Sequence, residues 1–229
     1  MARVLAAHQP NYLPWLGVLA KAVQADVFVL ADDVQFSKHG YTNRNRIRTA
    51  GGWQWLTVPV RTRGRGGQRL RDVAVDETQP WPRKHLESLR WNYGRAPHFE
   101  EHEAALVEIY GESHGRLLDW NLGLLRFLMD RFEIDAEVRL SSHLGSPAEG
   151  TRRIADMAVA CDCEIYLAGD GGSRSYLDER ILREAGVEVR YAGFEHPRYP
   201  QCFPGFEPGM CGLDLLLNCG PRSAEILHP

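Results

Sequence analysis

Three short runs of polar side chains in this sequence have residue types suited to acid–base chemistry and to the binding of a polar substrate. They lie at 8–15, 32–36 and 196–201, and each lies just beyond a predicted strand. A histidine can act as a general acid or base near neutral pH, and amide and phenol groups orient a polar ligand. The candidate residues of the three runs are His8, Gln9, Asn11, Tyr12, Trp15, Asp33, Gln35, His196, Tyr199 and Gln201.

The apolar runs before the first two clusters predict two buried strands, at 4–7 and 26–31, joined by a helix over 16–24. A strand, a helix and a strand within some thirty residues make a βαβ unit, so the strands should be parallel and their carboxyl ends should meet at one sheet edge. Ligands bind at that edge in open α/β sheets. We therefore expect His8 to be the acid/base, Asp33 its partner and His196 a second titrating group in the same pocket. The alternative for 8–17 is a Pro-rich turn that caps the next helix.

The sequence between residues 44 and 71 contains eight arginines and no acidic residue. Arginine presents a planar fork that suits phosphate or carboxylate, so this block indicates an anionic partner. Arg44 and Arg46 follow the second strand and are the predicted anion clamp. The Gly-rich loop 61–67 is predicted to join two strands, 55–60 and 70–75, as a solvated hairpin, or to act as a flap over the substrate.

Helical periodicity and apolar runs predict the remaining elements. Helices are expected at 81–93, 99–110, 116–132, 151–160, 176–185 and 213–218, and strands at 137–140, 164–168 and 187–191. The fold class is therefore α/β: an open, mostly parallel sheet flanked by helices, with a small β-hairpin. We expect a single domain, 1–229, in which 81–132 is a helical insertion or cover.

Composition limits the class of protein. The 229 residues are 44% hydrophobic, enough for a full core, and the net charge of −3 argues against a general polyanion binder. No apolar run approaches the roughly 20 residues of a membrane span, so a cytoplasmic location and no membrane partner are expected. Five cysteines match neither a disulfide framework nor a zinc ribbon and should be reduced.

Cys211 is a candidate nucleophile because it precedes a predicted helix, whose positive end should lower the thiol pKa. His8 or His196 could serve as its base. The alternative is a small apolar side chain packed under the terminal helix. A metal site built from His8, His196 and Asp33 is disfavoured because no ligand pair has i, i+4 spacing, and no metal is expected. The sequence has no P-loop, no complete GxGxxG and no GxSxG motif.

Several blocks of this sequence resemble the WbqC-like family. The N-terminal blocks are HQPNYLPWLG at 8–17, Lys21, DDVQF at 32–36, Arg44 with Arg46, and LTVP at 56–59; later ones are Lys84-His85, Tyr93, 166–169, 176–177, 196–201 and 213–220. The resemblance adds further expected substrate-binding residues: Lys21, Lys84, His85, Asp214 and Asn218. It implies biosynthesis of bacterial surface glycans, such as O-antigen, or of specialised metabolites. Cys211 stands where the family pattern usually has serine, so a thiol mechanism would not be general.

A fainter similarity links the opening strand, Pro-rich turn, helix and strand to the nucleotide-binding fold of pantothenate synthetase and nucleotidylyltransferases. Here the turn has one histidine, and the later Lys-Ser motif is missing. The leading hypothesis is an enzyme that transfers or condenses an acyl, aminoacyl or amino group on a small anionic substrate, such as a nucleotide sugar or an activated amino acid. The alternatives are an ATP-dependent ligase or nucleotidyltransferase, and a non-catalytic module that binds tRNA or another polyanion.

Overall fold

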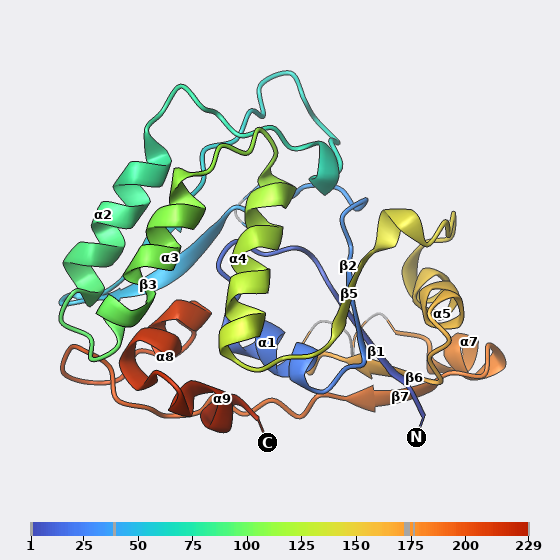
Figure 1. Ribbon diagram of the computed structural model, residues 1–229. Coiled ribbons are helices and arrows are strands. Elements are labelled where there is room, and N and C mark those ends of the chain that lie inside the picture. The colour runs from blue at the N-terminus through green and yellow to red at the C-terminus, as the bar shows by residue number, and fades with distance from the viewer. Residues whose placement is uncertain (1, 39, 172–174, 176, 229) are drawn as a thin grey trace. The chain divides into compact units, whose positions relative to one another are not determined.

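A computed structural model describes residues 2–38, 40–171, 175 and 177–228 (Figure 1). Its residues pack as two compact units, which we describe separately. The sheet unit comprises 1–9, 17–34 and 134–195, and the helical unit comprises 10–16, 35–133 and 196–229. The prediction that the chain is a single domain stays a prediction, because it depends on whether the two units fold cooperatively.

The sheet unit is built on a five-stranded sheet with the order β5-β2-β1-β6-β7, in which every neighbouring pair is parallel. The strands are β1 (Val4–His8), β2 (Val27–Leu30), β5 (Glu137–Leu140), β6 (Ile165–Ala168) and β7 (Glu188–Tyr191). The accompanying helices are α1 (Leu16–Val23), α5 (Gly150–Ala160) and α7 (Glu179–Glu184), with the 3-10 turn η2 at Ser141–His143. The predicted α/β class with a mostly parallel sheet is confirmed. The start of the helix predicted at 176–185 lies partly outside the described residues.

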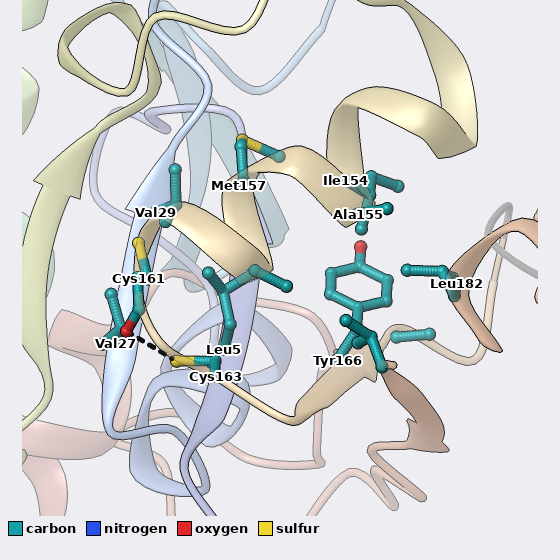
Figure 2. Close-up of a cluster of buried hydrophobic side chains, with 13 residues drawn as sticks. Leu5, Val27, Val29, Ile154, Ala155, Met157, Cys161, Cys163, Tyr166 and Leu182 are labelled. Atoms are coloured by element: carbon teal, nitrogen blue, oxygen red, sulfur yellow. Dashed lines mark hydrogen bonds between the residues drawn. The ribbon is translucent and has the colours of Figure 1, made fainter. Parts of the chain in front are cut away.

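The core of the sheet unit forms where α5 covers the sheet (Figure 2). Leu5 of β1 and Val27 and Val29 of β2 meet Met157 of α5 and Tyr166 of β6, all nearly or fully buried. The central strands have continuous apolar sequences because both faces of a parallel sheet are covered. The five cysteines of the chain are free thiols, at Cys161, Cys163, Cys202, Cys211 and Cys219.

The elements of the helical unit are β3 (Arg44–Thr49), β4 (Gly52–Thr57), η1 (Leu70–Asp72), α2 (Trp81–Tyr93), α3 (Phe99–Gly111), α4 (Leu117–Arg131), α8 (Gly212–Cys219) and α9 (Arg222–Leu227). In its described part, the helical unit contains four helices at the positions that periodicity predicts, α2, α3, α4 and α8, a short helix α9 that was not predicted, and a two-stranded hairpin (Figure 1). Helix α3 packs on α2 and α8, and α4 also packs on α8. In the described part of the chain no helix combines the length and the apolar character that a bilayer crossing requires.

The predicted hairpin is in the wrong place. Its strands are β3 and β4, which pair antiparallel and turn at Ala50-Gly51, with Gly52 at a φ of 119°. The segment predicted as a strand at 70–75 begins with the 3-10 turn η1 and joins residues 60–61 only through an isolated bridge, Val60 with Val75. Loop 61–67 therefore joins β4 to η1. Glycine suits the turn because positive φ carries no steric cost without a Cβ atom.

Candidate functional site

The strand order of the sheet unit reverses between β1 and β6. The chain builds β1, β2 and β5 outward in one direction and then crosses to place β6 and β7 on the other side of β1. In open α/β sheets the crevice at such a point, outside the carboxyl ends of the strands, is the usual ligand site. His8 ends β1 at this edge, and Asp170 follows β6. Residues 172–174 of the loop that follows β6 lie outside the described residues.

The geometry of His8 defines its tautomer. Its Nδ1 lies 2.9 Å from the backbone carbonyl oxygen of Gln9. A carbonyl oxygen can only accept, so Nδ1 carries the proton in the neutral ring and Nε2 carries the lone pair. Burial, and then the charge of Lys21, lower the pKa of His8 to about 4. His8 is therefore a neutral imidazole at neutral pH, with Nε2 able to accept a proton.

Lys21 lies beside His8, because its Nζ donates to the carbonyl of Ala7 at 2.9 Å. The side chain projects from α1 and is buried, with 6% exposed. Burial lowers its pKa to about 8, and the carboxylate of Asp170 opposes that shift. At neutral pH Lys21 is still mostly an ammonium ion. The two groups, which we call the His8–Lys21 pair, combine a proton acceptor and a proton donor at neutral pH, and the pKa of each lies below its ordinary value.

Asp32 and Asp33, which follow β2, accept hydrogen bonds from other residues of the sheet unit. Asp32 accepts from the Oγ of Ser141 at 3.1 Å and from the backbone N–H and Oγ of Ser142 at 2.9 and 2.7 Å. Asp33 accepts from Ser141 and from the guanidinium of Arg153. Burial would raise the pKa of Asp33, but the hydrogen bonds from Ser141 and Arg153 outweigh it and lower the pKa. Asp33 is therefore ionised, and these partners hold it in place.

His196 uses both ring nitrogens on backbone groups of the helical unit. Nε2 accepts from the N–H of Gly209 at 2.9 Å, so Nδ1 donates to the carbonyl of Pro197 at 2.8 Å. The ring also stacks on Tyr199, with centroids 6.4 Å apart. These bonds hold His196 in one neutral tautomer. Because His8 belongs to the sheet unit and His196 to the helical unit, their sharing of one pocket stays a prediction.

Asp214, Tyr199 and Gln201 were expected to bind substrate, and the structure shows them bonded to one another. The carboxylate of Asp214 is fully buried and accepts from the hydroxyl of Tyr93 at 2.9 Å. Its other oxygen accepts from the Tyr199 hydroxyl at 2.8 Å and from Nε2 of Gln201 at 2.7 Å. Burial raises the pKa of Asp214, and the three donors oppose that shift. This network ties α2 and the 199–201 segment to α8.

Tyr12 and His85 form a second buried network with Tyr110. The hydroxyl of Tyr12 lies 2.8 Å from Nδ1 of His85 and 2.5 Å from the hydroxyl of Tyr110. Burial lowers the pKa of His85 to about 4, opposed by its hydrogen bond to the Thr57 backbone. The neutral ring therefore donates from Nε2 to Thr57 and accepts from Tyr12 at Nδ1. Tyr110 in turn donates to Tyr12.

Replacing Tyr12 with phenylalanine should lower the free energy of unfolding by about 1–3 kcal/mol, because His85 and Tyr110 would each lose a buried partner. Urea denaturation followed by circular dichroism measures the change. The matched control is Tyr41→Phe at a half-exposed tyrosine, which should stay within about 0.5 kcal/mol of the unchanged protein. Equal stability of the two variants would show that the hydroxyl network contributes nothing.

Cys211 is the N-cap of α8, as the sequence predicts, but the predicted lowering of its pKa is wrong. The side chain is fully buried, and burial and then the nearby Asp214 raise the thiol pKa to about 12. The N–H groups of the helix start act in the expected direction and are outweighed. Cys211 is therefore a protonated thiol at neutral pH, packed where the alternative interpretation placed it.

The other expected site residues occupy varied positions. Gln9 is exposed in the sheet unit, and the rest belong to the helical unit. Asn11 is buried, Lys84 is exposed in the first turn of α2, and Asn218 donates from Nδ2 to the Asp214 carbonyl at 2.7 Å. The backbones of Trp15 and Gln35 form isolated β-bridges with those of Cys211 and Arg69, respectively. In the described ranges no group of three or more histidine, cysteine, aspartate or glutamate side chains could hold a metal ion.

Arg44 and Arg46 lie on the β3–β4 hairpin, where each guanidinium covers an indole. The Cζ of Arg44 is 4.2 Å from the ring centroid of Trp55, and that of Arg46 is 5.1 Å from that of Trp53. Sequence reasoning identified the arginines but not the tryptophans. The alternation of Arg44, Arg46 and Arg48 with Asn45 and Ile47 was the signal of a strand that would bring such partners together.

Comparison with known proteins agrees with the resemblance found in the sequence. The chain is 35% identical over 226 residues to the uncharacterized protein Rv1507c of Mycobacterium tuberculosis (strain ATCC 25618 / H37Rv), and the match covers 98% of this chain and 97% of that protein. No solved structure matches this chain at a significant level. The profile of the WbqC-like protein family matches residues 9–226. This protein therefore belongs to the WbqC-like protein family.

Proposed function

We propose that this protein is a group-transfer enzyme of bacterial surface-glycan or specialised-metabolite biosynthesis, and that the His8–Lys21 pair is its acid–base machinery. The substrate carries a phosphate or carboxylate, and the group transferred is acyl, aminoacyl or amino. The observation that carries the proposal is the position of the pair. A neutral imidazole and a buried ammonium lie together at the point of the sheet where strand order reverses.

The two groups have complementary tasks in such a transfer. Nε2 of His8 takes the proton of an acceptor hydroxyl or amine as that atom attacks the acyl carbon of the donor. The bond between the acyl carbon and the leaving group breaks, and the ammonium of Lys21 gives its proton to the departing atom. Lys21 can also hold an anionic group of the substrate before reaction, since its charge persists below a pH of about 8.

The pH dependence of turnover should therefore be bell-shaped. The base must be unprotonated, which requires a pH above about 4, and the acid must be protonated, which requires a pH below about 8. We expect kcat/KM to form a plateau between limbs near these two values. Measurement of initial rates in overlapping buffers at constant ionic strength tests this, and Lys21→Met should remove the alkaline limb. A rate that rises steadily through pH 9 would contradict the assignment of the acid.

The reaction class is tested by incubating purified protein with a panel of nucleotide sugars and sugar phosphates as acceptors and with acyl and aminoacyl thioesters as donors. Mass spectrometry should detect an acceptor that has gained the mass of the donor group, together with one equivalent of released thiol. Parallel reactions contain ATP with and without magnesium. Product formation only with ATP, accompanied by AMP or ADP, would replace the proposal with an ATP-dependent ligase. Other donors can be tested with the same mass measurement of the acceptor.

A further inference from the structure

The helical unit contains a pocket that none of the chemistry above uses. Its volume is about 330 Å³, within the range of small-molecule sites. Its polar lining residues are Lys38, Asn43, Arg44, Thr57 and Thr62, and none of the described residues that line it is acidic. The positive charges of Lys38 and Arg44 in this lining favour an anionic occupant.

The wall of this pocket is fixed by hydrogen bonds of the surrounding chain. Asn43 donates from its side chain to the carbonyl of Val58 at 2.9 Å, and its own carbonyl accepts from the Val58 N–H at 2.8 Å. Phe36, at another side, donates its N–H to Gln68 at 2.9 Å. The backbone of Thr57 accepts a hydrogen bond from the buried ring of His85. The pocket is therefore pre-formed, which reduces the entropy cost of binding a ligand.

An exposed aromatic surface adjoins the cationic end of the pocket. Arg44 lines the pocket and covers Trp55, and the ring of Tyr41 lies 5.7 Å from that of Trp55. The side chain of Tyr41 is 40% exposed. Its backbone is held in place, because its carbonyl accepts from the N–H of Tyr12 at 3.1 Å. The half-exposed ring of Tyr41 and the guanidinium of Arg44 thus both contact Trp55, and together they offer a platform for a planar ring that carries an anionic group.

From this juxtaposition we infer that the pocket binds a nucleoside phosphate. Lys38 and Arg44 hold the phosphate, and the base stacks on Tyr41. The exposed arginines of loop 61–67 raise the local potential, and Thr62 of the same loop forms part of the wall, so the loop attracts the anion to a site that it helps to shape. The inference concerns binding and does not depend on the group-transfer chemistry proposed for the sheet unit.

Isothermal titration calorimetry of the intact chain with UDP, ADP, pyrophosphate and uridine tests the inference. We expect both nucleoside diphosphates to bind, pyrophosphate to bind more weakly and uridine to give no heat. Lys38→Gln and Arg44→Gln should each weaken nucleoside diphosphate binding roughly tenfold or more. Tyr41→Ala should weaken nucleoside diphosphate binding by about five- to a hundredfold and leave pyrophosphate binding unchanged.

Two matched controls separate the pocket from general effects of charge and exposure. Arg126→Gln removes one positive charge from the surface of α4, and Trp91→Ala removes a ring that is 88% exposed on α2. Both should bind UDP as the unchanged protein does. Equal losses in a control and its partner variant would overturn the inference, as would absence of any nucleotide heat at millimolar concentration. So would binding of an RNA oligonucleotide with steep salt dependence but without nucleotide binding. Lys38 is exposed, so its variant remains informative if Arg44→Gln fails to fold.

Discussion

Replacing His8 with alanine is expected to lower kcat by about 10²- to 10⁴-fold, the contribution of a positioned general base. The loss follows from the removal of the Nε2 lone pair, which the bond from Nδ1 to the Gln9 carbonyl directs away from that carbonyl. The fold should survive, because the hydrogen bond made by the ring is to the adjacent residue. Steady-state kinetics on the substrate pair found by mass spectrometry gives kcat and KM separately.

Three companion variants make this result specific. His8→Gln keeps a polar side chain of similar size but cannot titrate, so it should be nearly as inactive as the alanine variant. His143→Ala removes an exposed histidine of the same unit and should retain full turnover. Nucleotide binding by the pocket of the helical unit should be unchanged in His8→Ala, which distinguishes failure of the catalytic proposal from failure of the binding inference. Full turnover by the His8 variants would show that another group is the base.

Replacing Asp214 with alanine is expected to lower the free energy of unfolding by about 3–5 kcal/mol, the largest effect on stability that we predict. The carboxylate accepts hydrogen bonds from Tyr93, Tyr199 and Gln201, and all three donors would be left in a buried cavity. Urea unfolding with linear extrapolation measures the loss. The control Asp119→Ala removes an exposed carboxylate from α4 and should change stability by less than about 0.5 kcal/mol. A loss below 1 kcal/mol for Asp214→Ala would contradict the network.

The variant Asp214→Asn isolates the charge from the hydrogen bonds. Burial raises the pKa of Asp214 above its ordinary value of 3.8, so the folded protein binds this proton more tightly than the unfolded chain does. The contribution of such a group to stability is largest in acid and declines as the pH rises through the folded-state pKa. The advantage of the unchanged protein over Asp214→Asn should therefore shrink as the pH rises. If the stability advantage of the unchanged protein grew with pH instead, the pKa of Asp214 would be lowered, not raised, in the folded protein.

The elements that the sequence predicts well are those whose burial leaves a regular pattern. The strands around Leu5 and Phe28 have continuous apolar runs, and α4 repeats leucine at helical spacing, so tertiary packing and local preference agree. Strand β3 was not predicted, because its sequence, RNRIRT, is mostly polar and has no apolar run. Its arginines occupy one face, and Asn45 and Ile47 are buried on the other.

The partners of the polar residues were harder to predict than their positions. Asp33 bonds Arg153, a residue 120 positions away, and Asp214 bonds Tyr93 across 121 positions. Nothing local in the sequence specifies such pairs, because they depend on how distant helices and strands pack. The direction of the pKa shift of Cys211 was predicted wrongly for a related reason. The helix end that lowers the pKa is a local feature, whereas the burial that raises it comes from residues far along the chain.

The tight turn at Ala50-Gly51 has a consequence for how this protein can diverge. Side chains of a strand alternate between faces, so inserting one residue there would shift the pairing and exchange the two sets. Arg44 and Arg46 would move to the face that Ile47 now occupies, and Ile47 would move to theirs, with loss of both indole contacts and of the wall that Arg44 contributes. Loop 61–67 carries no such constraint on pairing. Relatives with altered ligand preference should therefore vary in the length of that loop while keeping the number of residues between Arg44 and Thr57 constant.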